Sequence, residues 1–270
     1  MKKFVLIGNN INYSFSPILH TMIFNSTSIK ATYSILDNNN IANIITNIKN
    51  SDISGFNVTI PYKENIIKFL AYISPEALEI GAVNCVKVIN GKFFGYNTDY
   101  LGILETFKKM NLSLKNKKVF ILGSGGAAKA CWKSIVDCDG IPIIVSRNPD
   151  EISHLFKNTK IISYIDLINE KGYLLINATP IGTYPNINES PVDEGIIQNF
   201  DFLLDLIYNP KETKFIKIGK KYKKICENGL FMLISQGVKS EEIWNNLSIN
   251  THNIYSKLIN IAYNKNKEVK

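Results

Sequence analysis

The sequence lacks a long hydrophobic run. No apolar stretch in its 270 residues approaches the roughly 20 residues that a membrane-spanning helix requires. The run Phe4–Ile7 follows two lysines but ends at Gly8, which is too short for the hydrophobic region of a signal peptide. We therefore expect this run to be the first β-strand of a soluble, cytoplasmic protein. Hydrophobic residues make up 45% of the chain, which is enough for a sizeable core.

Arginine is nearly absent, although the chain is basic. The formal net charge is +8, yet Arg147 is the only arginine. Proteins that bind nucleic acids usually rely on arginine for bidentate contacts to bases and phosphates. The scattered lysines therefore argue against a nucleic-acid partner, and the positive charge instead suits small anionic ligands.

Cysteine is scarce as well, and it follows no recognisable pattern. The four cysteines form no C-x-x-C pair and have no metal-ligand spacing. We expect reduced thiols, as in a cytosolic enzyme, and no metal site. Internal repeats and low-complexity linkers are also missing from the chain.

A glycine-rich turn between a strand and a helix is the most informative feature present. The apolar run Val119–Leu122 leads into Gly123–Ala128, in which Gly123, Gly125 and Ala128 occupy the positions of G-x-G-x-x-(G/A). The first glycine permits a sharp turn, the second leaves room for a pyrophosphate, and the small third residue lets helix and strand pack closely. The helix N-terminus offers N–H groups to the phosphates. This pattern predicts a dinucleotide site.

The order of predicted elements divides the chain into two α/β domains. Strands, helices and a hairpin around Asn90-Gly91 alternate through residues 1–100, which is typical of a mixed α/β domain. From Lys117 the alternation is that of a doubly wound, Rossmann-type domain. A long amphipathic helix, Ser240–Asn264, is expected to return to the first domain.

Two serines follow the first predicted strand. Ser14 and Ser16 are two residues apart, so their hydroxyls point the same way from a loop, and the helix that opens at Ser16-Pro17 supplies N–H donors. This combination would hold a carboxylate. The alternative is that Ser16 is an ordinary N-cap of that helix.

A second group of polar residues surrounds the predicted strand Gly55–Thr59. Asn57 and Thr59 share one face of this strand because side chains alternate with period two. Lys63 then falls in the first turn of a predicted helix, Tyr62–Ala71, at the end of the macrodipole that disfavours a cation. Such an amine suits general acid/base chemistry. The alternative is an exposed lysine at a helix start.

Asp99 is the candidate partner of Lys63. It precedes the predicted helix Tyr100–Met110, so its alternative role is a plain N-cap. Paired with Lys63, its carboxylate would hold the charge and position of the amine. Asn84 adds a further polar group at the start of a strand.

The single arginine stands at the tip of the second strand of the nucleotide-binding region. The strand Ile141–Val145 leads directly into Ser146, Arg147 and Asn148. Enzymes that use NAD usually carry an acidic residue there for the ribose 2′-hydroxyl, whereas an arginine matches a 2′-phosphate. We therefore expect NADP.

Three later segments complete the candidate site. Asn177–Gly182 and Asp205–Pro210 each leave a strand at its carboxyl end, where doubly wound sheets bind ligands. Gly229–Gly237 runs from a loop into a helix, with Gln236 as a candidate ligand of a hydroxyl group. The alternative for this segment is an amphipathic helix start with Met232 in the core.

Taken together, these segments resemble the shikimate dehydrogenase family. The resemblance covers essentially the whole chain and rests on the order and spacing of S-x-S-P, N-V-T-x-P-x-K, G-A-V-N, G-x-N-T-D, G-x-G-G-A, N-A-T-P-I-G, D-x-x-Y-N-P and G-x-x-M-L-x-x-Q-G. It implies reversible, NADPH-dependent reduction of 3-dehydroshikimate to shikimate in aromatic amino-acid biosynthesis. It also implies a substrate domain (1–100 with 238–270), a Rossmann domain (101–237) and an active site in the cleft between them.

The resemblance assigns a role to each motif. Lys63 and Asp99 would form the catalytic pair, and Ser14 and Ser16 would bind the carboxylate. The residues that would line the substrate ring are Asn57, Thr59, Asn84, Thr98 and Gln236. The residues that would bind the cofactor are Gly123, Ser124, Gly125, Gly126, Ala127, Ser146, Arg147, Asn148, Thr179, Ile207, Tyr208, Gly229 and Met232.

The second strand tip departs from the family pattern. The family usually has N-R-T there, often with a further basic residue four positions later. This chain has Ser146, Arg147 and Asn148, with Glu151 at the later place. Discrimination against NAD would therefore be softer.

Two alternatives share these motifs. One is a dehydrogenase that acts on quinate or an aminoshikimate, and the other is a non-catalytic regulator that binds NADP or shikimate. A regulator needs neither Lys63 nor Asp99, so their presence argues against it. The expected partners are small molecules, without nucleic acid or membrane, and the expected assembly is a monomer or homodimer.

Overall fold

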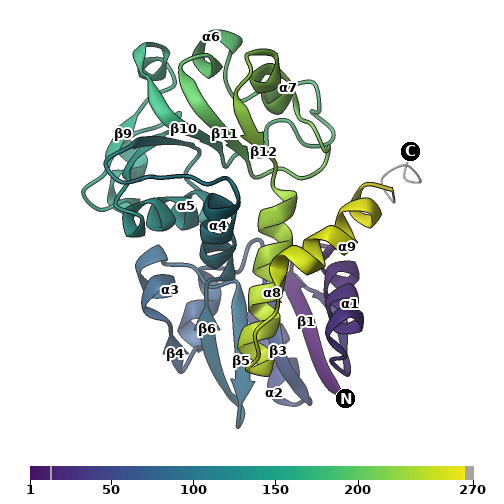
Figure 1. Ribbon diagram of the computed structural model, residues 1–270. Coiled ribbons are helices and arrows are strands. Elements are labelled where there is room, and N and C mark those ends of the chain that lie inside the picture. Colours follow the sequence, from purple (N-terminus) through teal and green to yellow (C-terminus); the bar gives the residue numbers. More distant parts are fainter. Residues whose placement is uncertain (13, 265–270) are drawn as a thin grey trace. The chain divides into compact units, whose positions relative to one another are not determined.

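The chain folds into two compact units, each built on its own six-stranded sheet. The computed structural model describes residues 1–12 and 14–264. Met1–Gly102 and the chain from Ile234 onward form unit 1, and Ile103–Leu233 form unit 2 (Figure 1). Within the described residues, no helix combines the length and the apolar character needed to cross a membrane.

Unit 1 has a mixed sheet with the strand order β2-β1-β3-β5-β6-β4. Its strands are β1 (Lys2–Gly8), β2 (Ala31–Asp37), β3 (Ile53–Val58), β4 (Tyr72–Ile73), β5 (Cys85–Ile89) and β6 (Lys92–Tyr96). Its helices are α1 (Ser16–Thr27), α2 (Ile41–Lys49), the 3₁₀ helix η1 (Asn65–Phe69), α3 (Pro75–Ile80) and α9 (Thr251–Asn264). The strand β5 is antiparallel to both of its neighbours, and the other pairs are parallel. The boundaries between the units fall within α4 (Thr98–Lys109) and α8 (Leu230–Asn245).

Successive residues of β1 belong to two different cores. Phe4 and Leu6 pack with Trp244 of α8 and with residues of α1 and β2. Val5 and Ile7 pack with residues of α2, α3 and β3 in the second core. Because strand side chains alternate with period two, a strand that is apolar at every position is buried on both faces. The β1 strand accordingly lies between β2 and β3 with helices over each face.

Unit 2 is a parallel, doubly wound sheet. Its strands are β7 (Lys118–Leu122), β8 (Ile141–Val145), β9 (Lys160–Ile162), β10 (Gly172–Asn177), β11 (Phe200–Asp205) and β12 (Ile225–Glu227). Between them lie α5 (Gly126–Asp137), η2 (Asp150–Leu155), η3 (Asp166–Asn169), α6 (Glu194–Ile197) and α7 (Lys214–Lys221). The order β9-β8-β7-β10-β11-β12 is the 3-2-1-4-5-6 order of dinucleotide-binding domains. The predicted fold class, a mixed α/β domain with a Rossmann-type domain, is confirmed.

The predicted helix Tyr62–Ala71 is wrong. Lys63 lies in a turn, the following 3₁₀ helix has five residues, and the chain then enters β4. The backbone N–H of Ala71 donates to Phe93 O (2.9 Å), and that of Ser74 donates to Gly95 O (2.9 Å). Pairing with β6 therefore takes the backbone groups that a longer helix would have used.

The predicted single helix Ser240–Asn264 is also wrong, because it is two helices. α8 ends at Asn245, and Asn246 follows with a φ of 52°. Asparagine tolerates this left-handed conformation, which commonly ends helices. The Glu242 carboxylate then accepts the N–H of Ile249 (2.8 Å), which fixes the connection to α9.

Candidate active site

Lys63 and Asp99 form an ion pair in unit 1. Their Nζ and Oδ2 atoms are 2.6 Å apart. Lys63 lies in the turn after β3, where its carbonyl accepts the N–H of Val83 (2.8 Å), and Asp99 is the second residue of α4. The side chains keep 24% and 12% of their exposure, so the pair is sheltered from water yet accessible to a small molecule.

Two expectations about this pair need correction. Since Lys63 precedes a short 3₁₀ helix rather than starting an α-helix, the macrodipole argument has no helix to act through. The N-cap alternative for Asp99 is wrong as well, because Asn97 Oδ1 accepts the N–H of Tyr100 (3.0 Å) at the start of α4. The carboxylate of Asp99 therefore serves Lys63.

Ser14 and Ser16 bring their hydroxyls together at the start of α1. Ser14 Oγ donates to Ser16 Oγ (3.1 Å) and accepts the Ser16 backbone N–H (3.2 Å). The helix begins at Ser16, and its N-cap residue is Phe15, which makes no side-chain capping bond. The N-cap alternative for Ser16 is thus wrong, and its hydroxyl is available for other partners.

Asn57 is buried, and its side chain is held from three directions. Its Nδ2 donates to Asn84 O (3.0 Å) and Ser240 Oγ (2.9 Å), while its Oδ1 accepts the hydroxyl of Tyr33 (2.8 Å). A backbone carbonyl can only accept, so the bond to Asn84 O fixes which way the amide points. Both N–H groups of Asn57 are committed, and only a lone pair on Oδ1 remains for a ligand.

Asn84 has the opposite polarity. Its Oδ1 accepts the backbone N–H of Thr98 (2.6 Å) and the Thr98 hydroxyl (3.2 Å). A backbone N–H can only donate, so this amide is also oriented without ambiguity, and its NH₂ group is left to bind a ligand. The two asparagines therefore offer an acceptor and a donor respectively.

Ser240 joins these groups to α8. Its hydroxyl accepts from Asn57, lies 3.2 Å from the Thr98 hydroxyl and donates to Gln236 O (3.0 Å). Thr59 lies at the end of β3, where its carbonyl accepts the N–H of Tyr62 (2.8 Å) in the turn that carries Lys63. The predicted ring residues thus lie in unit 1, and Asn57, Asn84, Thr98 and the backbone of Gln236 share one hydrogen-bond network.

Sequence reasoning missed Tyr33 and Ser240. Burial and, next, the charge of Glu241 raise the pKa of the Tyr33 hydroxyl well above its ordinary value, and a side-chain hydrogen bond from Ser16 lowers it. Tyr33 therefore links the serine pair to Asn57. Ser240 follows Gln236 by four residues, a helical spacing that could have revealed it. Tyr33 lies on β2 and Asn57 on β3, and β1 lies between these two strands in the sheet. No local sequence pattern could therefore have predicted their contact.

The glycine turn of unit 2 is open where a phosphate would lie. Gly123 has a φ of 105°, and a Cβ there would lie 3.2 Å from Thr179 Cγ2, so the position favours glycine. A Cβ on Gly125 would meet no atom within 4 Å. Gly125 is also the N-cap of α5, and no side chain caps this helix N-terminus. Ala128, in the first turn of α5, is fully buried. The residues present fit a dinucleotide pyrophosphate at this helix N-terminus.

The tip of β8 places Arg147 on the surface. Ser146 is buried, and its Oγ accepts the N–H of Asn148 (3.1 Å). Burial raises the pKa of the Tyr164 hydroxyl, and the charge of Arg147 lowers it, so the guanidinium acts on this ring. Asn148 Nδ2 donates to Glu151 Oε2 (3.0 Å). The Glu151 carboxylate is therefore hydrogen-bonded to a residue at the tip of β8.

The carboxyl ends of β10 and β11 are joined by a buried acid, Asp205. Its Oδ1 accepts Asn177 Nδ2 (3.0 Å) and the N–H of Ile207 (3.1 Å), and its Oδ2 accepts the hydroxyl of Thr213 (2.5 Å). Burial raises the pKa of Asp205 to about 6, although these three hydrogen bonds oppose the shift. Asp205 is a third residue, after Tyr33 and Ser240, that sequence reasoning left without a role.

The remaining predicted cofactor residues gather around that edge. Thr179 donates its N–H and its hydroxyl to Asn177 Oδ1 (3.0 and 2.7 Å), and the N–H of Gly229 donates to Ile207 O (3.1 Å). Tyr208 is half-buried beside Ile207, and Met232 is nearly buried in the first turn of α8. The structure brings Gly123, Thr179, Ile207 and Gly229 together within unit 2.

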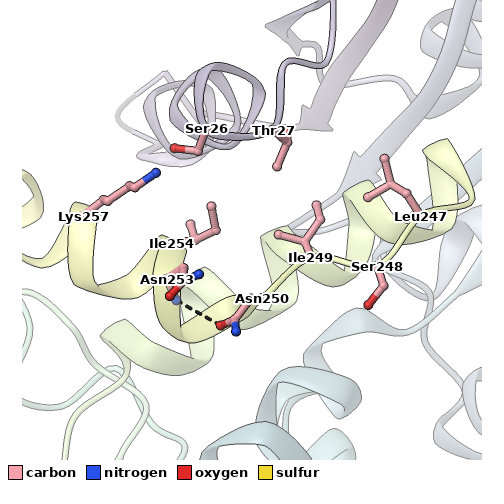
Figure 2. A pocket seen from close by; sticks show the side chains of 9 residues that line it. All are labelled: Ser26, Thr27, Leu247, Ser248, Ile249, Asn250, Asn253, Ile254 and Lys257. Carbon is pink, nitrogen blue, oxygen red and sulfur yellow. Dashed lines mark hydrogen bonds between the residues drawn. The ribbon is translucent and has the colours of Figure 1, made fainter.

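A pocket elsewhere in unit 1 contains none of the predicted site residues. It has a volume of about 330 Å³ and lies between the end of α1, at Thr27, and the α8–α9 connection, at Ile249 (Figure 2). Lys257 of α9 reaches over it, and Asn250 Oδ1 accepts the N–H of Asn253 (3.1 Å) at its floor. This pocket mixes apolar and polar side chains without an ion pair comparable to Lys63 and Asp99.

Comparisons with known proteins agree with the motifs. A family model described as the shikimate dehydrogenase substrate binding domain matches residues 6–86. A curated protein of Clostridium perfringens named shikimate dehydrogenase (NADP(+)) is 41% identical, over 96% of this chain and 98% of its own length.

Solved structures are similar over the same extent. Shikimate dehydrogenase 1 from Peptoclostridium difficile has a TM-score of 0.89 and 41% identity, with 96% of this chain and 98% of that chain covered. The Thermus thermophilus enzyme, solved in complex with NADP(H) and shikimate, has a TM-score of 0.86 and 28% identity, covering 95% and 98%. With this extent of similarity, the chain belongs to the shikimate dehydrogenase family.

Proposed function

We propose that this chain catalyses the reversible reduction of 3-dehydroshikimate to shikimate with NADPH, a step in aromatic amino-acid biosynthesis. The observation that carries the proposal is the pair Lys63–Asp99, with Nζ and Oδ2 2.6 Å apart, in the same unit as the oriented polar groups of Asn57, Asn84 and Thr98. A sheltered amine held by a carboxylate suits proton transfer to a ring oxygen. In this role, unit 1 is the substrate domain and unit 2 the nucleotide domain.

The proton chemistry falls to Lys63. NADPH, when bound, supplies the hydride that reduces the ring carbonyl carbon, and negative charge develops on the carbonyl oxygen. The Lys63 ammonium stabilises this charge and donates the proton that completes the hydroxyl group. In the reverse direction the neutral amine takes the proton back. The Asp99 carboxylate fixes the amine in place through the ion pair.

The substrate is recognised by groups with defined polarity. The hydroxyls of Ser14 and Ser16, of which Ser14 donates to Ser16 here, turn to donate to the substrate carboxylate. Asn57 Oδ1 accepts a hydrogen bond from a ring hydroxyl, because both of its N–H groups are committed, and Asn84 Nδ2 donates a hydrogen bond to a ring oxygen. Thr59, Thr98 and Gln236 complete the ring contacts.

The cofactor is NADP, held in unit 2. Its pyrophosphate binds over Gly125 at the N-terminus of α5, with Gly123, Ser124, Gly126 and Ala127 forming the turn. Arg147 pairs with the 2′-phosphate at the tip of β8, flanked by Ser146 and Asn148. The nicotinamide end is held by Thr179, Ile207, Tyr208, Gly229 and Met232. Glu151, which engages the same strand tip through Asn148, weakens the preference for NADP over NAD.

The cellular compartment, the partners and the assembly complete the proposal. The four cysteines, Cys85, Cys131, Cys138 and Cys226, carry free thiols, which supports a reducing compartment, and we infer that the protein works in the cytoplasm. Its partners are then small molecules, without nucleic acid or membrane. The assembly is a monomer or homodimer, which the molar mass in solution distinguishes.

The test is an assay of the purified protein with shikimate and quinate, each with NADP and with NAD. Formation of reduced nicotinamide is followed by its absorbance, and Lys63→Ala is the matched negative control. We expect the largest kcat/KM with shikimate and NADP and almost none in the variant. A larger kcat/KM with quinate would instead identify the alternative substrate. Binding of NADP or shikimate without turnover would identify a regulator and contradict the proposal.

A further inference from the structure

A buried histidine–glutamate pair lies behind the proposed substrate residues of unit 1. His20 Nδ1 and Glu241 Oε1 are 2.6 Å apart, and both side chains have essentially no exposure. Glu241 Oε2 also accepts Asn245 Nδ2 (2.9 Å). A carboxylate accepts hydrogen bonds from donors, so this geometry places a proton on His20 Nδ1. The other ring nitrogen, Nε2, is buried and has no hydrogen-bond partner among residues 1–12 and 14–264.

The buried, unpaired Nε2 of His20 lowers the stability of the fold, so we expect the histidine to have a role that compensates for this loss. Leaving a buried polar group without a partner destabilises the fold, because the group loses the hydrogen bonds that it makes to water in the unfolded chain. A phenylalanine is also a flat aromatic ring, although a somewhat larger one, and it would not carry that cost. The histidine therefore does something that an apolar ring cannot do, and Nδ1 is the atom that does it. Through Nδ1, the Glu241 carboxylate sets the plane in which the imidazole lies.

The imidazole in turn lies flat against Tyr33. The two rings are 4.0 Å apart between centroids, with an interplanar angle of 4°. Trp244 and Phe24 pack at an angle to the imidazole, with centroids 5.5 and 6.3 Å away. A phenol clamped in this way has a fixed ring plane, so its hydroxyl points in one direction. That hydroxyl donates to Asn57 Oδ1 (2.8 Å), and it lies close enough to Ser16 for the serine hydroxyl to lower its pKa.

Both members of the pair are also close in sequence to residues of the proposed site. His20 follows Ser16 by one turn of α1, and Glu241 follows Ser240 directly in α8. A single contact between these side chains therefore ties together the two helices that carry the serine hydroxyls and the partner of Asn57. Within the described part of the chain, neither side chain forms a hydrogen bond or ion pair with Lys63 or Asp99.

We propose that His20 and Glu241 are positioning residues for substrate binding: they clamp the Tyr33 phenol and, through it, hold Ser16 and Asn57 in the orientation that receives the substrate carboxylate and a ring hydroxyl. The inference rests on the proposed function. It adds two buried residues that act through Tyr33 and have no contact with the reacting atoms.

The first experiment is a double-mutant cycle between His20→Phe and Tyr33→Phe in the full chain. His20→Phe keeps an aromatic ring on Tyr33 but removes the contact to Glu241, and Tyr33→Phe removes the hydroxyl alone. We expect each single change to raise KM for shikimate about tenfold, the scale of one lost oriented hydrogen bond. The value of kcat should change less, and KM for NADP should stay constant. The double variant should resemble Tyr33→Phe, because the clamp acts through that hydroxyl.

Glu241→Gln and its neighbour Glu242→Gln supply a matched comparison. Both remove one carboxylate from α8, but Glu242 contacts Lys239 Nζ (2.8 Å) rather than a histidine. Glu241→Gln should reproduce the KM effect of His20→Phe, and Glu242→Gln should leave KM for shikimate unchanged. Strictly additive effects of His20→Phe and Tyr33→Phe on KM, or equal losses in all kinetic constants, would overturn the inference and leave the proposed function intact.

A measurement without turnover keeps the inference testable if the wild-type protein proves inactive. Protein with ¹³C-labelled tyrosine rings reports on Tyr33, whose signals are assigned by their loss in Tyr33→Phe. The clamp predicts separate signals for the two ring edges in the wild type, because a stacked ring flips slowly, and averaged signals in His20→Ala. Averaged signals in the wild type would contradict the clamp regardless of the enzymatic result.

Discussion

At the residue scale, the proposed function assigns the proton transfer to Lys63. Its replacement by alanine should lower kcat by about 10²-fold or more, the usual scale for an acid/base group, with a smaller change in KM. Asp99→Asn should also slow turnover, because it leaves the amine in place without its 2.6 Å ionic partner. Both residues serve one proton transfer, so a double-mutant cycle in kcat should be strongly non-additive. Independent effects, or a normal kcat in Lys63→Ala, would refute the pair.

Ser14 and Ser16 should act on binding alone. In the proposed function, replacing both with alanine removes two hydroxyl donors to the substrate carboxylate, each expected to contribute on the order of 1.5–3 kcal/mol. KM for shikimate should therefore rise strongly, while the dissociation constant of NADP stays the same. Because Ser16 does not cap α1, the helix content measured by circular dichroism should be unchanged. An unaltered KM would remove the serines from the site.

Arg147 should decide the choice of nucleotide. Arg147→Ala removes an exposed guanidinium from the tip of β8, so its loss should leave the fold intact. Binding of NADP should weaken by roughly 1–3 kcal/mol, the scale of a charge-assisted contact, and binding of NAD should change far less. Calorimetric titration with each nucleotide measures the difference. Parallel weakening for both nucleotides would show that the arginine does not contact the 2′-phosphate.

At the scale of elements, Asp205 links the ends of β10 and β11, and it makes the stability of the fold depend on pH. Its pKa is about 6 in the folded chain and near 4 when unfolded, so the folded state binds more protons between these values. The free energy of unfolding therefore falls as pH rises from about 4 to 6, by on the order of 3 kcal/mol from this group alone. Asp205→Asn should remove that component.

The control for this prediction lies on the same strand. Asp201 is exposed on β11, so Asp201→Asn should preserve the wild-type dependence. Denaturant unfolding at several pH values measures the free energy for all three proteins. If Asp205→Asn keeps the wild-type slope between pH 4 and 6, the buried carboxyl is not the titrating group.

The elements that could be predicted are those whose pattern of apolar residues is visible within the segment itself. The parallel sheet of unit 2 follows from apolar runs bounded by glycine, and the two-faced burial of β1 follows from its continuous apolar character. The helix expected at Tyr62–Ala71 failed because β6 offers backbone partners from a distant part of the chain. Prediction of the site is limited in the same way. The pairing of Lys63 with Asp99 could be predicted from the sequence motifs that contain them. The contact between Tyr33 and Asn57 could not, because it forms only when β2, β1 and β3 assemble into a sheet.

At the scale of the whole molecule, unit 1 is discontinuous. The rings of Phe4 and Trp244 stack 4.4 Å apart although they come from opposite ends of the chain. Unit 2, Ile103–Leu233, is one uninterrupted stretch. A chain that stops at residue 233 keeps all of unit 2 but lacks the helix that covers Phe4 and Leu6. We expect it to bind a hydrophobic dye that the full chain does not bind, because that apolar face is uncovered; equal dye binding would show that other residues cover it.

This discontinuity has a consequence for synthesis on the ribosome. Unit 2 emerges as a complete segment and can close its core while translation continues, since domains generally fold as they are completed. The β1 strand emerges before unit 2, yet one of its faces waits for Trp244, which is made only after all of unit 2. Throughout that interval the nascent chain presents an apolar surface of Phe4 and Leu6, the kind of surface that chaperones bind. A strand that is translated before unit 2 is thus fully buried only after unit 2 is complete.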